Sequence, residues 1–536
     1  MRIMYHADSN GIAHLPQDTL PTKIAAIVRE NAANLVGLGA GIFTIFCLLA
    51  LPSANYWNIR LPLYLMLVVW ILLRPRVALY LLPIAIPWGS LDTITLAGLN
   101  LNSADILVGL FAVSWLLSFT LRPLLARQRS GPLDREAVNT PRYLVFAMLA
   151  LLLAMTLSLI TTLGFSLSLK EIVKWLEAFV VLVLGTQYLR TRRQIWTLII
   201  IACLAALSQA VLGYLQFALG LGPASFIRDA ALRVYGTFDQ PNPYAGYINM
   251  TLTIVVALLL LGRGVAVRVL AGFTTIVLLG AEILSQSKGG YLALGVALLF
   301  IIIVGLARHR VLLCCIIITV LVVVSFYLAG LVPDHLFAAL LQRVGLVNLS
   351  FTFPTNDNYA NSERLAHWIA GLLMFRDHPL LGVGIGNYAT AYPRYAQGIF
   401  VIPLGHAHNY YINMAAEAGI AGLIGLLAFL TAVFVSGGRV LRVISKKYRQ
   451  AAGRLAQPQP GMQVAEARTM RERLRELMND RALAAGLLAA LLSVCVHNVV
   501  DDLYVHSMTI LFALLLAMLI RLEAGVPNKG DSSSAF

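Results

Sequence analysis

Long apolar runs recur along the whole chain and constrain its fold more than any other feature of the sequence. Stretches such as 144–160 and 311–331 are almost free of charge and are about as long as the hydrocarbon core of a bilayer requires. Residues are 59% hydrophobic and 12% charged, whereas soluble domains average roughly 45–50% and about 25%. The runs are continuous rather than alternating, which excludes a porin-type barrel. We therefore expect an all-α polytopic membrane protein.

A window of bilayer length predicts roughly 12–14 transmembrane helices. The predicted spans are 33–51, 60–73, 76–88, 104–121, 142–161, 170–188, 194–218, 243–261, 267–285, 289–306, 311–331, 411–436, 483–500 and 507–521. The second and third are short and separated by Arg74-Pro75-Arg76, so they form a broken pair or two half-helices.

The distribution of charge predicts the topology. About 30 of the 40 basic residues fall on one side of the predicted spans, and the positive-inside rule places that side and both termini in the cytoplasm. The formal charge of +15 is therefore a topology signal and a contact with lipid headgroups, not a nucleic-acid-binding surface. The polar residues 1–30 show no signal-peptide pattern.

The expected organisation follows from these spans. In order, the segments are a cytoplasmic N-terminal segment (1–32), transmembrane helices 1–11 (33–331), a long external loop (332–410), transmembrane helix 12 (411–436), a basic cytoplasmic hairpin (437–482), transmembrane helices 13–14 (483–521) and a cytoplasmic tail (522–536). We expect the external loop to be partly helical. Loops of this length are usually functional.

The external loop concentrates cationic and histidine side chains, against the trend of the positive-inside rule. They include Arg343, Arg364, His367, Arg376, His378, Arg394, His406 and His408. An anionic ligand explains them, because guanidinium groups bind phosphate in a bidentate manner. The alternative is that some of these arginines only pair with Glu363 or Asp377.

Three other external features point to the same face. Arg228 and Arg233 precede a turn-rich segment, 235–246. Lys288 lies in a hairpin so short that its ammonium must sit at or just below the membrane surface, which makes it a site hypothesis. Lys174 and Glu177, three residues apart near the outer end of the sixth span, are expected to form an intrahelical ion pair, with ligand binding as the alternative.

Histidines mark two outer helix ends. His406 and His408 precede the twelfth span, where a histidine can act as a general base near neutral pH; the alternative is a structural polar group. His497 and Asp501 lie one turn apart at another outer helix end, and we expect this pair to fix a tautomer. All five cysteines fall in apolar segments without metal-binding spacing, so no metal site is predicted.

Four motifs occur in order on the predicted outer face. They are Gly236-Thr237-Phe238 with Ala245-Gly246, Ser285-Gln286-Ser287-Lys288-Gly289, Glu363-Arg364 with the glycine-rich 382–388, and His408-Asn409 followed by Gly419 and Gly422. Together they resemble the O-antigen ligase/polymerase superfamily, which includes lipopolysaccharide O-antigen ligases, Wzy-type polymerases and protein O-oligosaccharyltransferases. The resemblance is strongest over about 160–435.

The resemblance implies a metal-independent, inverting glycosyltransferase of the bacterial inner membrane, with its active site facing the periplasm or exterior. The implied donor is a glycan linked to undecaprenyl diphosphate. His408 would be the general base, and Arg364 and Lys288 would bind the diphosphate. Lys288 stands where the family has an arginine, so the bidentate fork is lost there, and Arg233 would compensate.

The predicted substrate-binding set is completed by Arg233, Arg228, His406, Asn409, Lys174 and Glu177. No cofactor or metal is expected. The expected partners are the lipid-linked donor, a glycan or lipid acceptor and the bilayer, with no nucleic acid.

The acceptor and the class of activity leave alternatives. The acceptor is lipid A-core, another glycan repeat or, third, a protein, because the chain shows no extra external domain. A lipid-linked oligosaccharide flippase or polysaccharide exporter is the alternative from another class. A flippase needs charges lining a path through both leaflets, and the spans are nearly charge-free at mid-membrane, which favours chemistry at one surface.

Overall fold

The computed structural model describes residues 57–91, 93–96, 99–125, 140–228, 231–305, 348–355, 358–456 and 464–523. Over these residues the chain has fourteen α-helices and only two short antiparallel β-hairpins. It divides into two compact units, residues 1–73 and 74–536. The first contributes α2 (Trp57–Leu73), and the second contains every other described element. The predicted all-α polytopic fold is confirmed.

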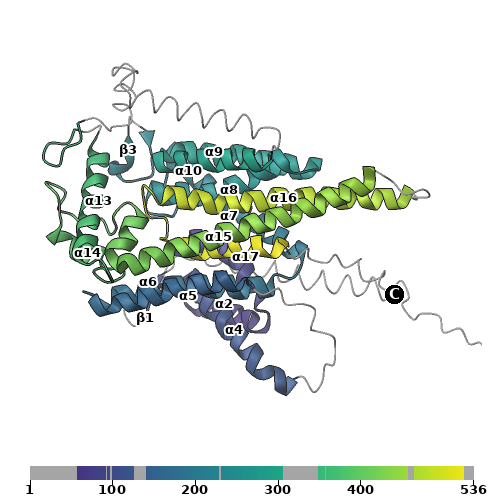
Figure 1. Ribbon diagram of the computed structural model, residues 1–536, viewed down its shortest axis with the longest axis horizontal. Coiled ribbons are helices and arrows are strands. Elements are labelled where there is room, and N and C mark those ends of the chain that lie inside the picture. The colour runs from purple at the N-terminus through teal and green to yellow at the C-terminus, as the bar shows by residue number, and fades with distance from the viewer. Residues whose placement is uncertain are drawn as a thin grey trace, which may run out of the picture. The chain divides into compact units, whose positions relative to one another are not determined.

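The second unit is a bundle of helices, most of them long (Figure 1). Its helices are α3 (Arg76–Trp88), α4 (Ser103–Leu125), α5 (Arg142–Leu157), α6 (Phe165–Tyr188), α7 (Arg192–Leu219), α8 (Pro241–Leu261), α9 (Val265–Ser285), α10 (Lys288–Gly305), α13 (Tyr359–Asp377), α14 (Tyr388–Ala391), α15 (Tyr410–Ala456), α16 (Val464–His497) and α17 (Met508–Glu523). Short 3-10 turns are η2 (Gly89–Leu91), η4 (Ser158–Thr161), η5 (Ala224–Phe226) and η7 (Tyr392–Arg394). The hairpins pair β1 (Thr93–Leu96) with β2 (Leu99–Asn102), and β3 (Ile227–Arg228) with β4 (Ala231–Leu232).

Seven described helical segments are long and apolar enough to cross a membrane. They are Arg142–Thr161, Arg192–Leu219, Pro241–Leu261, Val265–Ser285, Lys288–Gly305, Tyr410–Ala456 and Val464–His497. The predicted break at 74–75 is present, because α2 ends at Leu73 and α3 begins at Arg76. The predicted spans 33–51 and 311–331 lie outside the described residues.

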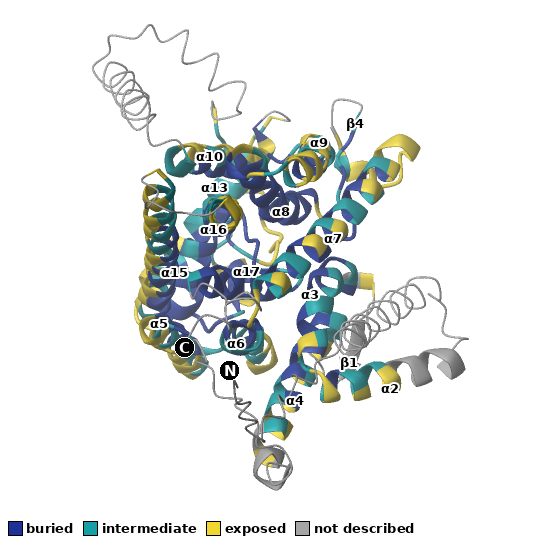
Figure 2. Cartoon of the chain, turned by 90° about the vertical axis from the view of Figure 1, so that its right-hand side faces the viewer, coloured by how far each residue is buried: buried dark blue, intermediate teal, exposed yellow. Residues whose placement is uncertain are grey.

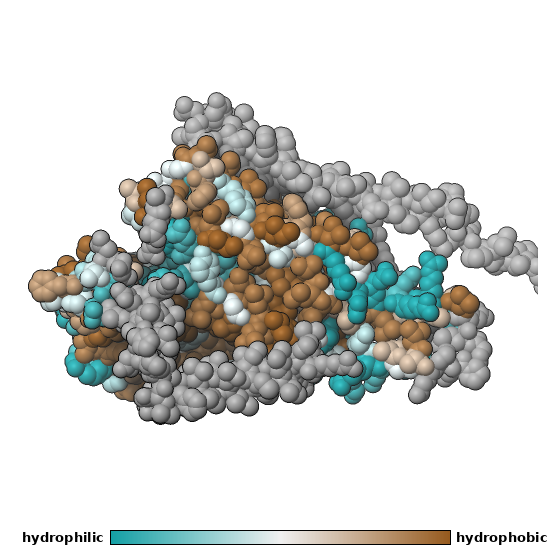
Figure 3. Space-filling model, turned by 90° about the horizontal axis from the view of Figure 1, so that it is seen from above, coloured by the Kyte–Doolittle hydropathy of each residue, from teal (hydrophilic) through white to brown (hydrophobic). Residues whose placement is uncertain are grey.

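The helices differ in what surrounds them. In α8, 89% of the apolar segment is buried, compared with 28% in α9 and in α10. α8 packs against α16, α9 and α10 and is mostly buried, whereas α9 and α10 keep exposed apolar faces (Figure 2). Apolar residues also cover the middle of the face seen in Figure 3, with hydrophilic residues gathered toward the end where α15 and α16 extend. Such exposed apolar faces suit contact with lipid.

The 332–410 loop contains a helix, α13, which packs on α15 (Figure 1). Buried aromatic residues hold α14 and the following turn in place, including Tyr388 and Tyr392. At Gly419, α15 is kinked, with φ 64° and ψ −161°, and a side chain there would overlap the backbone of Leu380. Glycine is therefore required where the loop after α13 meets α15. We call this part of the bundle, with α13, α14 and residues 498–507, the α13 end.

Candidate functional site

His408 lies at the α13 end, directly before α15, in a left-handed backbone conformation (φ 51°). Its carbonyl accepts the indole N–H of Trp368 at 3.1 Å, and its Nδ1 lies 3.3 Å from Oδ1 of Asp501. A carboxylate only accepts hydrogen bonds, so Nδ1 carries the proton and Nε2 is left as an acceptor. Nε2 is buried, and no described group bonds to it. His408 is therefore held in the tautomer that a general base needs.

Asp501 lies in the segment between α16 and α17, 93 residues from His408 in the sequence. The backbone N–H of Tyr410 donates to the carbonyl of Asn498 at 2.9 Å, which holds the start of α15 against this segment. Burial alone would raise the pKa of Asp501, but the hydrogen bond from His408 and the charges of His406 and His408 hold it well below its usual range. The carboxylate is therefore ionised and stabilises a protonated His408.

His406 forms a second contact with Asp501. Its Nδ1 accepts the backbone N–H of His408 at 3.0 Å, and its Nε2 lies 3.9 Å from Oδ1 of Asp501. Nε2 therefore carries the proton in the neutral ring. Burial, together with the charge of His408, lowers the pKa of His406.

The ligand atoms of His406, His408 and Asp501 lie within 4.8 Å of one another, a spacing that could hold a metal ion. A metal on Nε2 of His406 would force the proton onto Nδ1, where it would oppose the backbone N–H of His408. The hydrogen bonds of this group therefore suit proton transfer better than metal binding.

A cationic cluster lies around the turn between α9 and α10. The Nε of Arg233 donates to the carbonyl of Ser285 at 3.1 Å, and its Nη2 donates to Oδ1 of Asn242 at 3.1 Å. Ser287 accepts the backbone N–H of Gly290 at 3.2 Å and so caps α10. Lys288 is the first residue of α10, and its side chain is exposed. Two predicted phosphate-binding cations thus flank one turn.

The helix α13 contributes a third cation and two more titratable groups. Arg364 is half-buried and lies within electrostatic range of Glu363 and His497. Burial raises the pKa of Glu363, although the charges of His408 and Arg364 oppose the rise. His367 stacks on Tyr392 with ring centroids 4.4 Å apart, and burial and then the charges of His408 and His406 lower its pKa to about 4.

Five buried nitrogens of this site have no hydrogen-bond partner among the described residues. They are Nε of Arg364, Nε2 of His367, Nε2 of His408, and Nδ1 and Nε2 of His497. An unpaired buried polar atom costs about 1–3 kcal/mol, so such a concentration is expected where a polar ligand supplies the missing partners. The arrangement suits an anionic ligand beside a hydroxyl that loses a proton.

The predicted ion pair between Lys174 and Glu177 was wrong. Lys174 Nζ lies 2.5 Å from Glu171 and donates to the carbonyl of Tyr504 at 2.8 Å, whereas Glu177 contacts Asp105 of α4. Residues three before and three after a helical position lie roughly 120° apart around the helix. Since Tyr504 draws Lys174 toward the α16–α17 segment, the preceding glutamate is the one within reach.

Two other residues, Asn409 and Arg228, were predicted to bind substrate. Asn409 Oδ1 accepts the backbone N–H groups of Tyr411 and Ile412 at 3.0 and 3.1 Å, so it caps α15. Arg228 ends β3, and its side chain is outside the described part of the chain. Roles in substrate binding for these residues, and for Lys174 and Glu177, stay predictions.

Sequence reasoning missed three contacts of this site. Asp501 was expected to serve His497, but its carboxylate bonds to His408. Asn242 donates to the other oxygen of that carboxylate, Oδ2, at 2.6 Å. In the sequence, Asn242 is distinguished only by its position between two prolines. His367 lies edge-on to His408, with ring centroids 5.5 Å apart. No local spacing could reveal these contacts, because the partners come from segments far apart in the sequence.

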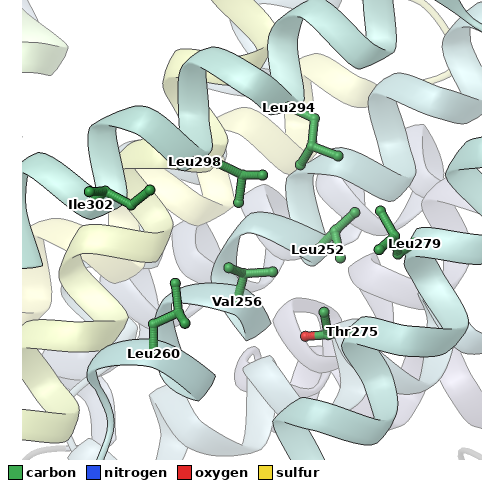
Figure 4. A pocket seen from close by; sticks show the side chains of 8 residues that line it. All are labelled: Leu252, Val256, Leu260, Thr275, Leu279, Leu294, Leu298 and Ile302. Atoms are coloured by element: carbon green, nitrogen blue, oxygen red, sulfur yellow. The ribbon is translucent and has the colours of Figure 1, made fainter. Parts of the chain in front are cut away.

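An apolar pocket of about 270 Å³ lies between α8, α9 and α10 (Figure 4). Its lining residues are Leu252, Val256, Leu260, Thr275, Leu279, Leu294, Leu298 and Ile302. The α10 side chains continue along the helix that begins at Lys288. Such a lining suits a hydrocarbon chain rather than a sugar or a phosphate.

Comparison with known proteins bears on the family. A search of curated proteins finds no match to this chain. Residues 273–427 match the family model described as O-antigen ligase. The match spans α9 to the first part of α15 and includes Lys288, Arg364 and His408. Over residues 273–427 the chain is therefore similar to the O-antigen ligase family, and this match confirms the resemblance to the O-antigen ligase/polymerase superfamily for that part of the chain.

Proposed function

We propose that this protein transfers a glycan from an undecaprenyl-diphosphate-linked donor to an acceptor hydroxyl at the outer face of the bacterial inner membrane, without a metal ion. The observation that carries the proposal is the state of His408. Its Nδ1 is held by Asp501, and its buried Nε2 has no described partner. A base in this state is ready to receive one proton from a bound hydroxyl.

The reaction needs one proton acceptor and one site for the departing charge. Nε2 of His408 takes the hydroxyl proton while the acceptor oxygen forms a bond to the anomeric carbon. The bond from that carbon to the phosphate oxygen breaks, and its electron pair leaves with the diphosphate. Attack from the face opposite the leaving group inverts the anomeric centre. Asp501 stabilises the imidazolium that forms.

The leaving diphosphate is assigned to Lys288 and Arg364, with Arg233. Arg364 provides a planar fork for phosphate oxygens, whereas Lys288 provides a point charge without that geometry. Arg233 is held at the same turn by Ser285 and Asn242. We assign the polyprenyl tail to the apolar pocket between α8, α9 and α10, because its lining continues along α10 from Lys288. A saccharide or lipid-linked saccharide is the proposed acceptor.

The test is transfer in vitro with the full-length protein in lipid nanodiscs. Undecaprenyl-diphosphate-linked glycan and candidate acceptors are supplied with EDTA present, and wild type is compared with His408→Ala and Arg364→Ala. Loss of a general base is expected to lower the rate by about 10²–10⁴-fold. The matched controls are His378→Ala and Arg376→Ala, which change exposed residues at the end of the same helix, α13.

Each outcome separates the alternatives. Product from wild type that is lost in both variants but not in the controls supports the proposal, and product length distinguishes a ligase from a polymerase. Full activity of His408→Ala would remove the proposed base. Donor movement across liposomes without transfer to any acceptor would replace the proposal with a flippase.

A further inference from the structure

The side-chain amide of Asn242 connects two parts of the proposed site. One part is the His408–Asp501 pair, and the other is Arg233 with the turn that precedes Lys288. Asn242 is the second residue of α8, and its Nδ2 donates to Oδ2 of Asp501 at 2.6 Å. Its Oδ1 accepts from Nη2 of Arg233 at 3.1 Å and from Oγ of Ser287 at 3.0 Å. The orientation of the amide is settled by these partners, because a carboxylate only accepts and a guanidinium only donates.

Each partner of Asn242 leads to one half of the site. Asp501 bonds through its other oxygen to Nδ1 of His408. Arg233 is anchored to the carbonyl of Ser285, and Ser287 caps the helix that Lys288 begins. The hydrogen bonds therefore run without a break from the proposed base to Arg233 and to the turn that precedes Lys288.

The surroundings make this connection rigid and electrostatically effective. α8 is the most buried of the candidate spans, and prolines on both sides of Asn242 fix the backbone at its start. Asp501 is buried, and Asn242 and Arg233 are half-buried, so water is partly excluded and successive hydrogen bonds polarise one another. The charge of Arg233 therefore reaches Asp501 through the amide dipole of Asn242.

We propose that Asn242 is a positioning residue that couples the donor subsite to the base, so that donor binding and proton transfer are organised by one side chain. The inference rests on the proposed function. Asn242 does not itself touch the reacting atoms. Its removal releases Asp501 on one side and Arg233 with Ser287 on the other.

Steady-state kinetics of the full-length protein test the coupling. Arg233→Gln is expected mainly to raise the donor KM, and Asp501→Asn mainly to lower kcat. Asn242→Ala is expected to do both, by about tenfold each. Binding of farnesyl diphosphate as a short donor analogue is expected to weaken in Asn242→Ala by a similar factor.

A double-mutant cycle makes the test specific. The effects of Arg233→Gln and Asp501→Asn on kcat/KM are expected to be non-additive by about fivefold in the wild-type background. In the Asn242→Ala background the two effects are expected to become additive. Coupling that persists without Asn242 would overturn the inference.

A second variant covers the case in which Asn242→Ala is poorly folded. Asn242→Asp keeps the shape of the side chain but presents a carboxylate to Asp501. Two carboxylates this close cannot both ionise and share one proton, so Asp501 stabilises the protonated base less and the acid limb of the kcat profile is expected to move to lower pH. The other groups that face His408 are His406, His367, Glu363 and, through Asp501, His497. An unchanged limb together with wild-type KM would contradict the inference.

The matched control is Asn249→Ala, a deletion of the same amide seven residues farther along α8. Asn249 donates to Oε1 of Glu282 at 3.1 Å and to the carbonyl of Gly290 at 2.9 Å. Its loss is expected to lower Tm and to leave the pH profile and the cycle as in wild type. Absence of transfer in wild type itself would refute the proposed function, whereas an active wild type with an additive cycle would refute only the coupling.

Discussion

The two ends of the bundle carry charge in opposite ways. Where α15 and α16 extend beyond the apolar belt, exposed arginines form ion pairs such as Arg468 with Glu472 at 3.4 Å within one helix and Arg439 with Glu523 at 2.7 Å between helices. At the α13 end, the Asp501 side chain is only 7% exposed and is shared by three residues from two other parts of the chain. The first end has more charges, but only the second has a buried charged group with several hydrogen-bond partners, as is expected of an active site.

Solvent explains this difference. An exposed ion pair contributes about 0–1 kcal/mol, because water competes for both partners. A buried charge interacts far more strongly with its neighbours, and removing one partner is correspondingly costly. Charge density in the sequence therefore indicates topology, whereas burial and shared partners indicate where chemistry occurs. The four changes below test that contrast.

The largest effect is expected at the shared carboxylate. Asp501→Asn should lower the transfer rate by about 10²-fold or more, because the amide can no longer stabilise a protonated His408 or hold its tautomer. Single-turnover transfer measures the effect. Asp377→Asn is the control, since Asp377 is exposed and pairs with its exposed neighbour Arg376 at 2.9 Å. Equal losses of transfer rate in Asp501→Asn and Asp377→Asn would contradict the contrast between buried and exposed carboxylates.

The next effect is expected where α10 meets His497. A Cβ on Gly289 would lie 2.8 Å from Cδ2 and Nε2 of His497, whereas a Cβ on Gly295 would have nothing within 4 Å. Gly289→Ala should therefore displace the ring and lower kcat/KM by about tenfold, which corresponds to about 1.4 kcal/mol. Gly295→Ala in the same helix should leave activity unchanged and stabilise the protein slightly. The pair of variants is compared by transfer rate and Tm.

Acid should unfold the α13 end through His367. Its pKa of about 4 lies below the ordinary 6.5, so the unfolded chain binds a proton between these values while the folded ring stays neutral. Stability is therefore full above pH 6.5 and falls by about 1–3 kcal/mol as the pH drops toward 4. His367→Phe, which keeps the aromatic stack on Tyr392, should reduce this loss in Tm against pH.

A histidine outside the buried cluster is the control for this titration. His378 is exposed, and His378→Phe should leave the dependence of Tm on pH as in wild type. If His367→Phe were as acid-sensitive as wild type, another group would have to account for the loss.

The smallest effect is expected at the opposite end. Arg468 and Glu472 have side chains that are 83% and 65% exposed, so Arg468→Ala should change the free energy of unfolding by less than about 0.5 kcal/mol. The transfer rate should not change. A large loss of either quantity would show that the α15–α16 extension does more than carry surface charge, and a chemical unfolding curve with a transfer assay measures both.

Much of the fold could be predicted from the sequence alone because it depends on local properties. Apolar runs of bilayer length predict helices wherever they occur, and α5 to α10 begin and end within a few residues of the predicted spans. The break at 74–75 follows from a proline between two arginines. The cations of residues 332–410 are also visible in the sequence, and their place on the outer face of the membrane stays a prediction.

The sequence by itself determined the class of fold, the candidate cationic and histidine residues of the site, and the family motifs. The tertiary structure alone decided which of those residues act together. Asp501 was expected beside His497, one turn away, yet it bonds to His408 and Asn242, which are 93 and 259 residues distant. Lys174 had two glutamates at equal spacing and took the one that its contact with Tyr504 left within reach. Hydrogen bonds act over about 3 Å, and only the packing of helices brings side chains from distant segments that close.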